Sequence, residues 1–205
     1  MLENRHEPPA HVLPLCETFE EDIRRHVLTY LLEGYPPCWK GDHMPNFLEQ
    51  IVAEWFEFRG YFVRRNINVG RRPKGGFESE LDVVAFHPGK RHLVHVEPSM
   101  DADSWDQREK RFGAKFAAGR KHIPTLFSGF DLPKIEHIAL LVFAGEQGHA
   151  TLGGGKVLLI KDLMHEIRTD PEWGLAARSV RNKAVPEQYV ILRTLQFAAN
   201  YWKAA

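Results

Sequence analysis

The chain has 205 residues, which is enough for one sizeable hydrophobic core with additional segments around it. Its hydrophobic content of 43% and charged content of 26% are ordinary for a soluble globular protein, and no apolar run approaches the roughly 20 residues of a membrane span. Basic and acidic residues number 27 each, so the net charge of zero does not indicate a nucleic-acid partner.

The cellular compartment is predicted from the cysteines and the first residues. Cys16 and Cys38 are the only cysteines and form no CxxC pair, so neither a disulfide framework nor a cysteine-rich zinc site is expected. Residues 1–9 are too polar for a secretory signal. We therefore expect a cytoplasmic protein that has no contact with a membrane.

Residues 1–40 are predicted to be an N-terminal extension that contains one helix. Thr18 to Glu21 has the form of a capping box, and apolar residues follow at helical spacing as far as Gly34. A turn at Pro36-Pro37 then separates this helix from residues 41–205. We expect residues 41–205 to form a single domain.

This domain alternates helical and strand patterns. Strands are predicted at residues 61–69, 80–86, 91–97, 135–144 and 156–160. Helices are predicted from about Pro45 to Arg59, from the capping box at Ser104 to about Gly119, from Asp162, and between Pro186 and Trp202. Residues 71–76 are expected to form a flexible basic loop. The whole order, α-α-β-β-β-α-β-β-α-α, predicts an α/β domain with helices packed on both sides of a mixed sheet.

Three acidic residues stand out in this order. Glu49 borders the apolar face of its predicted helix, whereas the pattern around Glu54 indicates a solvated residue. Asp82 lies inside the strand "ELDVVAF", where a carboxylate is unfavourable, and Glu97 ends the next strand. Alone, each residue would fit a salt bridge or an exposed strand end.

The predicted hairpin brings two of these carboxylates together. A turn at His87-Pro-Gly-Lys90 pairs the strands of Asp82 and Glu97, so that both side chains reach one edge of the sheet. Two adjacent carboxylates repel one another unless a positive charge joins them. Mg²⁺ prefers oxygen ligands, and Mn²⁺ can substitute for it, so the sequence predicts a divalent metal site with Asp82, Glu97 and Glu49 as ligands.

The segments "NFLEQIVAEWFEFRGYFV", "ELDVVAF" and "HLVHVEPS" resemble the PD-(D/E)XK nucleases of the restriction endonuclease-like superfamily. Glu49 precedes Gly60-Tyr61 by one helix, Asp82 matches the motif Asp with Leu81 at the position of the motif Pro, and Glu97-Pro98-Ser99 matches the (D/E)-x-K motif. The resemblance covers about residues 45–145. It implies a three-layer fold with a mixed central sheet and metal-dependent hydrolysis of nucleic acid.

The chain departs from this family at Ser99, which stands where the motif Lys would be. We expect Pro98 to end the strand before residue 99. In some members of the superfamily the Lys comes from the following helix, where Arg108, Arg111 and Lys115 lie along one flank of an apolar stripe. We take Lys115 as the substitute and expect its ammonium within ~6 Å of the Glu97 carboxylate. The alternative is a nuclease fold that has lost catalysis.

Two basic runs flank this candidate site, and they predict contacts with phosphates, although each alone would fit a solvated face. The residues assigned to nucleic-acid binding are Arg64, Arg65, Arg71, Arg72, Lys74, Arg108 and Arg111. His95 lies on the same face of its strand as Glu97 and is expected to be a core or near-site residue.

The sequence therefore predicts an Mg²⁺-dependent endonuclease that hydrolyses DNA in restriction, repair or defence. Glu49, Asp82, Glu97 and Lys115 are its predicted catalytic residues. The alternative is a catalytically inactive module that binds DNA or assembles a complex. A homodimer is plausible, because cutting both strands with one site per chain needs two chains.

Overall fold

A computed structural model of the chain describes residues 46–143, 149–181 and 183–202. The chain divides into residues Met1–Met44 and Pro45–Ala205, and all described residues belong to the second unit. The helix predicted from Thr18, together with Cys16 and Cys38, lies outside the described residues, so the extension of residues 1–40 stays a prediction. In the part of the chain that the structure describes, no helix has the length and apolar character needed to cross a membrane.

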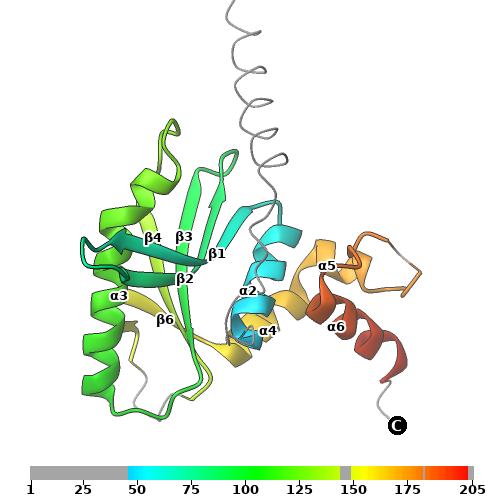
Figure 1. Cartoon of the computed structure of the whole chain (residues 1–205). Coiled ribbons are helices and arrows are strands. Elements are labelled where there is room, and N and C mark those ends of the chain that lie inside the picture. The colour runs from blue at the N-terminus through cyan, green and yellow to red at the C-terminus, as the bar shows by residue number, and fades with distance from the viewer. Residues whose placement is uncertain (1–45, 144–148, 182, 203–205) are drawn as a thin grey trace, which may run out of the picture. The chain divides into compact units, whose positions relative to one another are not determined.

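A mixed six-stranded sheet forms the centre of this unit (Figure 1). Its strands are β1 (Phe62–Arg71), β2 (Phe77–His87), β3 (His92–Ser99), β4 (Ile135–Leu141), β5 (Thr151–Leu152) and β6 (Gly155–Leu159), in the spatial order β1-β2-β3-β4-β6-β5. Strand β2 is antiparallel to β1 and β3, β4 is parallel to β3 and β6, and β5 is antiparallel to β6. The predicted α/β class with a mixed sheet is confirmed.

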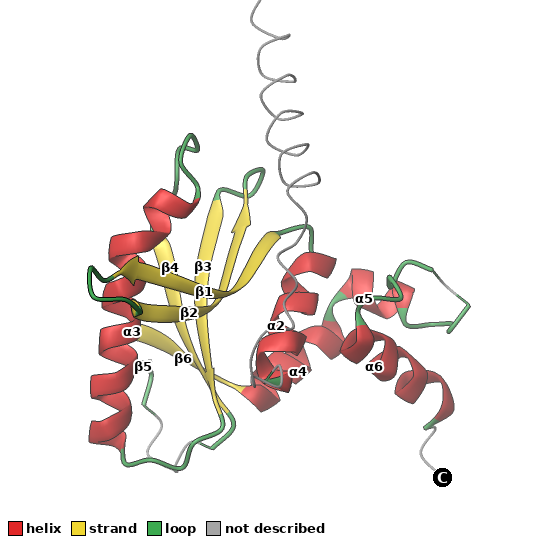
Figure 2. Ribbon diagram, in the orientation of Figure 1, coloured by secondary structure: helices red, strands yellow, loops and turns green. Residues whose placement is uncertain are grey.

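The described residues form five helices, which lie on the two sides of the sheet (Figure 2). Helix α3 (Trp105–Leu126) lies on one face, α2 (Phe47–Phe58) and α4 (Ile160–Thr169) lie on the other side, and beyond them α5 (Pro171–Ala176) packs against α4 and α6 (Val190–Tyr201) packs against α2. The alternation of β-strand side chains explains both cores. Val84 and Phe86 of β2 pack with Ile123 of α3, whereas Val83, which points to the opposite face, packs with Trp55 of α2.

Helix α3 begins as predicted but is longer. The Ser104 capping box is present, and the helix continues beyond Gly119 to Leu126. Gly119 is not a stop signal, because it packs against the sheet: a Cβ there would lie 2.4 Å from His95 Nδ1. The prediction that the helix ends near Gly119 is therefore wrong, and the glycine is explained by close packing.

Strand β3 does not end before residue 99, contrary to the prediction from Pro98. Ser99 pairs with Leu141 of β4, and its carbonyl accepts a hydrogen bond from Val142 N at 3.2 Å. Because successive residues of a strand direct their N–H groups to opposite sides, the Pro98 nitrogen faces the β2 side. The β2–β3 register reaches only as far as Val83 opposite Val96, so Pro98 removes no donor from this pairing.

Glu54 is buried, with 2% exposure, whereas its sequence pattern predicts a solvated residue. Its Oε2 accepts hydrogen bonds from the N–H groups of Ile191 and Leu192, each at 2.9 Å, in the first turn of α6. The first N–H groups of a helix have no acceptors within the helix, and a negative charge is favourable there. Glu54 thus caps α6 from α2, a contact that the pattern of one helix cannot reveal.

Candidate active site

Asp82 and Glu97 meet where β2 separates from β3. Val83 pairs with Val96, so the next positions along the two strands, Asp82 and Glu97, lie opposite each other. The Asp82 N–H donates to Glu97 Oε1 at 3.3 Å. Before this point β2 pairs with β1 alone, and β1 has a positive φ of 52° at Asn66, which forms no pair although the register is the same on either side of it. The two carboxylates therefore stand at a fork in the sheet.

Lys115 reaches this fork from α3. Its Nζ lies 2.8 Å from Asp82 Oδ1 and 2.8 Å from Glu97 Oε2. The side chains of Glu97, Asp82 and Lys115 are 3%, 17% and 27% exposed. The predicted approach of Lys115 to within ~6 Å of Glu97 is confirmed by this distance, whereas its catalytic role stays a prediction.

The site carries more negative than positive charge. Burial raises the pKa of Asp82 to about 7, and the charge of Glu97 adds to this effect. Burial also raises the pKa of Glu49, near the start of α2, to about 7, with further contributions from Asp82 and Glu80. Burial opposes the charge of Lys115, but Glu97 and Asp82 raise the pKa of its ammonium above the ordinary value. A further cation would relieve this repulsion.

Two buried histidines lie behind Glu97. His95 Nε2 is 2.7 Å from Glu97 Oε1, and His95 Nδ1 is 3.2 Å from His137 Nδ1. Burial lowers the pKa of His95 to about 3 and the pKa of His137 to about 4, so both imidazoles are neutral at neutral pH. The contact of His95 with Glu97 is therefore a hydrogen bond rather than an ion pair.

The carboxylate pair suits Mg²⁺ in its chemistry, because this ion is commonly held by one or two carboxylates with water in the remaining positions. Among the residues that the structure describes, no three His, Cys, Asp or Glu side chains gather as a ready metal site. Glu49 interacts electrostatically with Asp82 but does not complete such a group. Its role as a metal ligand stays a prediction.

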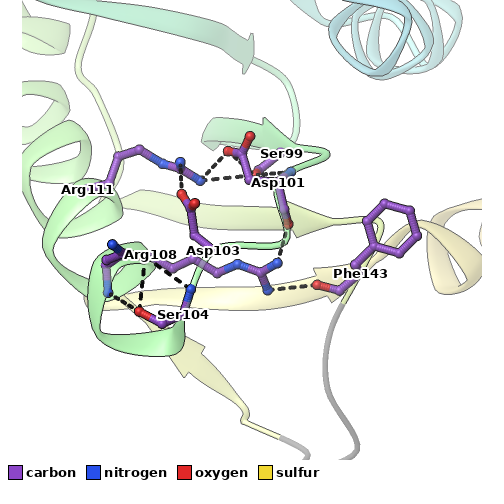
Figure 3. A network of polar contacts seen from close by, with 8 residues as sticks. Ser99, Asp101, Asp103, Ser104, Arg108, Arg111 and Phe143 are labelled. Atoms are coloured by element: carbon purple, nitrogen blue, oxygen red, sulfur yellow. Dashed lines mark hydrogen bonds and ion pairs between the residues drawn. The ribbon is translucent and has the colours of Figure 1, made fainter.

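Ser99, at the position of the motif Lys, is held by an arginine (Figure 3). Its Oγ accepts a hydrogen bond from Arg111 Nη2 at 3.0 Å and donates to Asp101 Oδ2 at 2.9 Å. Arg111 also pairs with Asp101 at 2.6 Å and with Asp103 at 2.8 Å. A second cation thus lies next to residue 99, but two aspartates already neutralise it. The sequence predicts that Arg111 lies on the same flank of α3 as Lys115, but it does not predict the ion pairs with Asp101 and Asp103.

Arg108 is 4% exposed, whereas the sequence predicts a surface contact with nucleic acid. Its guanidinium donates to Phe143 O at 2.7 Å and to Asp101 O (Figure 3). These bonds tie α3 to the segments that follow β3 and β4. The residue is not presented to a ligand, and its position is explained by this bridging role.

Comparisons with known proteins do not show a family for this chain. No family model and no curated protein matches it. One solved structure that it resembles is AF1548, a protein of unknown function, with a TM-score of 0.40 and 17% identity over 74% of this chain and 96% of AF1548. A similarity of this extent carries no argument about fold or function.

The remaining residues assigned to nucleic-acid binding lie on the β1–β2 hairpin. Arg71, Arg72 and Lys74 are exposed at its turn, and Arg65 is exposed but donates to Gln50 Oε1 at 2.6 Å. Arg64 is half-buried. The turn therefore presents a group of cations to solvent, and its contact with DNA stays a prediction.

Proposed function

We propose that this chain is an Mg²⁺-dependent endonuclease of the restriction endonuclease-like superfamily that hydrolyses DNA phosphodiester bonds. The observation that carries the proposal is the contact of Asp82, Glu97 and Lys115 at the sheet fork. The three residues come from β2, β3 and α3, the elements to which the resemblance assigns the motif Asp, the motif Glu and a displaced motif Lys.

Each side chain has a distinct role in this proposal. Asp82 and Glu97 would hold the metal ion, and Glu49 would orient one of its waters. Bound Mg²⁺ would lower the pKa of an attacking water and offset phosphate charge. Lys115 would release its carboxylates and stabilise the charge that develops on the phosphate. The cations at the β1–β2 turn would bind the DNA backbone.

The proposal is tested by incubating the protein with plasmid, linear and branched DNA in Mg²⁺ or Mn²⁺. Wild type should cleave at least one of these substrates, and Asp82→Ala and Glu97→Ala should abolish cleavage. Cleavage that survives both substitutions would rule out this site. Sedimentation in the presence and absence of DNA would show whether two chains act together, as cutting of both strands by one site per chain requires.

A second candidate is an inactive module that binds DNA or assembles a complex. The observation that favours it is the ion pair itself, because Lys115 already satisfies both carboxylates, and Ser99 supplies no charge. Calorimetric titration with Mn²⁺ separates the two functions. DNA binding without measurable Mn²⁺ binding would favour the inactive module.

A further inference from the structure

Glu97 has its two oxygens in different surroundings. Oε2 faces the Lys115 ammonium at the sheet fork, whereas Oε1 accepts hydrogen bonds from His95 Nε2 at 2.7 Å and from Asp82 N at 3.3 Å. The hydrogen bonds to Oε1 therefore fix the rotation of the Glu97 carboxylate. Of the groups at Oε1, His95 is the side chain that a substitution can remove.

Hydrogen positions in the histidine pair follow from its geometry. A carboxylate only accepts hydrogen bonds, so His95 Nε2 must carry the proton directed at Glu97. The two Nδ1 atoms lie 3.2 Å apart, so one of them donates and the other accepts, and with one proton on each ring the donor is His137 Nδ1. His137 Nε2 is left as a bare acceptor, and it is a buried atom without a hydrogen-bond partner among the described residues.

The packing around the pair leaves these rings little freedom. His95 is fully buried, with its ring edge-on to Phe116 at a centroid distance of 5.5 Å. A Cβ at position 119 would lie 2.4 Å from His95 Nδ1 and 3.4 Å from His137 Cε1, so α3 approaches the rings closely only because residue 119 is glycine. Glycine inside a helix is destabilising relative to alanine, and the space that it leaves here is filled by the two imidazoles.

We propose that His95 is a positioning residue for Glu97, and that His137 fixes the His95 tautomer that this role requires. His95 directs Oε2 of Glu97 toward the sheet fork. The proposal rests on the proposed function, in which Glu97 binds the metal ion, and adds a buried second layer to that site. Such outer partners commonly change metal affinity or activity by about 10- to 100-fold when they are removed.

The tautomers are tested first in the wild-type protein, without metal and at neutral pH, by long-range ¹H–¹⁵N NMR of the histidine rings. The expected pattern is a proton on Nε2 and none on Nδ1 for His95, with the reverse arrangement for His137. Protonation of His95 on Nδ1, or on both nitrogens, would overturn the proposal.

The positioning role is tested by calorimetric titration of Mn²⁺ into purified variants that retain wild-type circular dichroism. His95→Leu should weaken Mn²⁺ binding by about 10- to 100-fold. His95→Gln, whose amide can donate from a position near Nε2, should restore most of the affinity. The matched control is His92→Gln on the same strand, because His92 bonds to Tyr61 and Glu136 away from the fork. Equal Mn²⁺ affinity for His95→Leu and wild type would contradict the proposal.

The substitution Gly119→Ala tests the same positioning role without changing a polar group. Its methyl group should displace His95 and weaken Mn²⁺ binding in the same direction as His95→Leu, and unchanged binding would count against the proposal. Failure of the proposed nuclease function has a different signature: wild type would neither bind Mn²⁺ nor cleave DNA. In that case the NMR result would still decide the proposal. A proton on Nε2 alone in His95 would support the positioning of Glu97, and a proton on Nδ1 of His95 would refute it.

Discussion

The Lys115 ammonium lies 2.8 Å from Glu97 Oε2 and at the same distance from Asp82 Oδ1, so one cation bridges the two carboxylates that we propose as metal ligands. The ammonium and a metal ion would compete for these oxygens. If Lys115 contacted only the phosphate or the attacking water, its removal would leave metal affinity nearly unchanged. The contact with both carboxylates changes that expectation.

Lys115→Met should therefore increase Mn²⁺ affinity several-fold while lowering DNA cleavage by about 100-fold or more, the effect typical of removing one transition-state charge partner. Calorimetry measures the first effect and plasmid cleavage the second. Lys161→Met, at an exposed position of α4, is the matched control and should change neither. Undiminished cleavage by Lys115→Met would exclude the proposed role.

Asp82→Asn should change the pH dependence of stability when a chelator is present. Burial raises the pKa of Asp82 from 3.8 to about 7, so the folded state holds this proton more tightly than the unfolded state does. Its contribution to stability is fully present below the unfolded pKa and is lost as the pH rises toward about 7. Urea unfolding at several pH values should show wild type losing stability relative to Asp82→Asn over this window. A pH-independent difference between the two proteins would disprove this assignment.

The candidate site shows which features a sequence can predict. The hairpin turn predicts that Asp82 and Glu97 lie together, and helical periodicity predicts that Lys115 lies on the side of its helix that faces the sheet. Both predictions use only residues that are close in the sequence. Sequence reasoning missed the burial of Glu54 and Arg108 because their partners lie far along the chain, at Leu192 and at Phe143. The prediction from Pro98 was wrong because a missing backbone N–H weakens a strand only where a neighbouring strand would accept its hydrogen bond. Which strands are neighbours depends on the order of strands in the sheet, and that order cannot be predicted from the sequence around Pro98.

Ser99→Lys should fail to rescue Lys115→Ala unless Arg111 is also replaced. Residue 99 shares the Glu97 face of β3, so a lysine there would point in the required direction. Arg111 Nη2 lies 3.0 Å from the Ser99 hydroxyl, however, and would repel the new ammonium. We expect partial recovery of cleavage in Ser99→Lys/Arg111→Ala/Lys115→Ala and none with Arg111 present. Equal recovery in both backgrounds would show that Arg111 does not control this position.

The two basic regions should respond differently to substitution. Arg71→Ala and Arg72→Ala should weaken DNA binding and flatten its salt dependence, by about one unit of log–log slope for each phosphate that the protein no longer neutralises. Arg108→Ala should instead lower the free energy of unfolding, by about 2–3 kcal/mol, because it removes a buried charged donor from two carbonyl oxygens. Fluorescence anisotropy across a salt series and urea unfolding distinguish the two outcomes. If Arg108→Ala lowered DNA affinity and left stability unchanged, Arg108 would instead be a DNA-binding residue.

The bonds from Glu54 to the first turn of α6 join residues 137 and 138 positions apart. Contacts of such long separation close late, because the intervening chain must first be ordered. During synthesis, α2 leaves the ribosome long before residues 191 and 192, so the Glu54 carboxylate lacks these two N–H donors until α6 has also emerged. The contact between α2 and α6 can therefore form only after α6 has been synthesised.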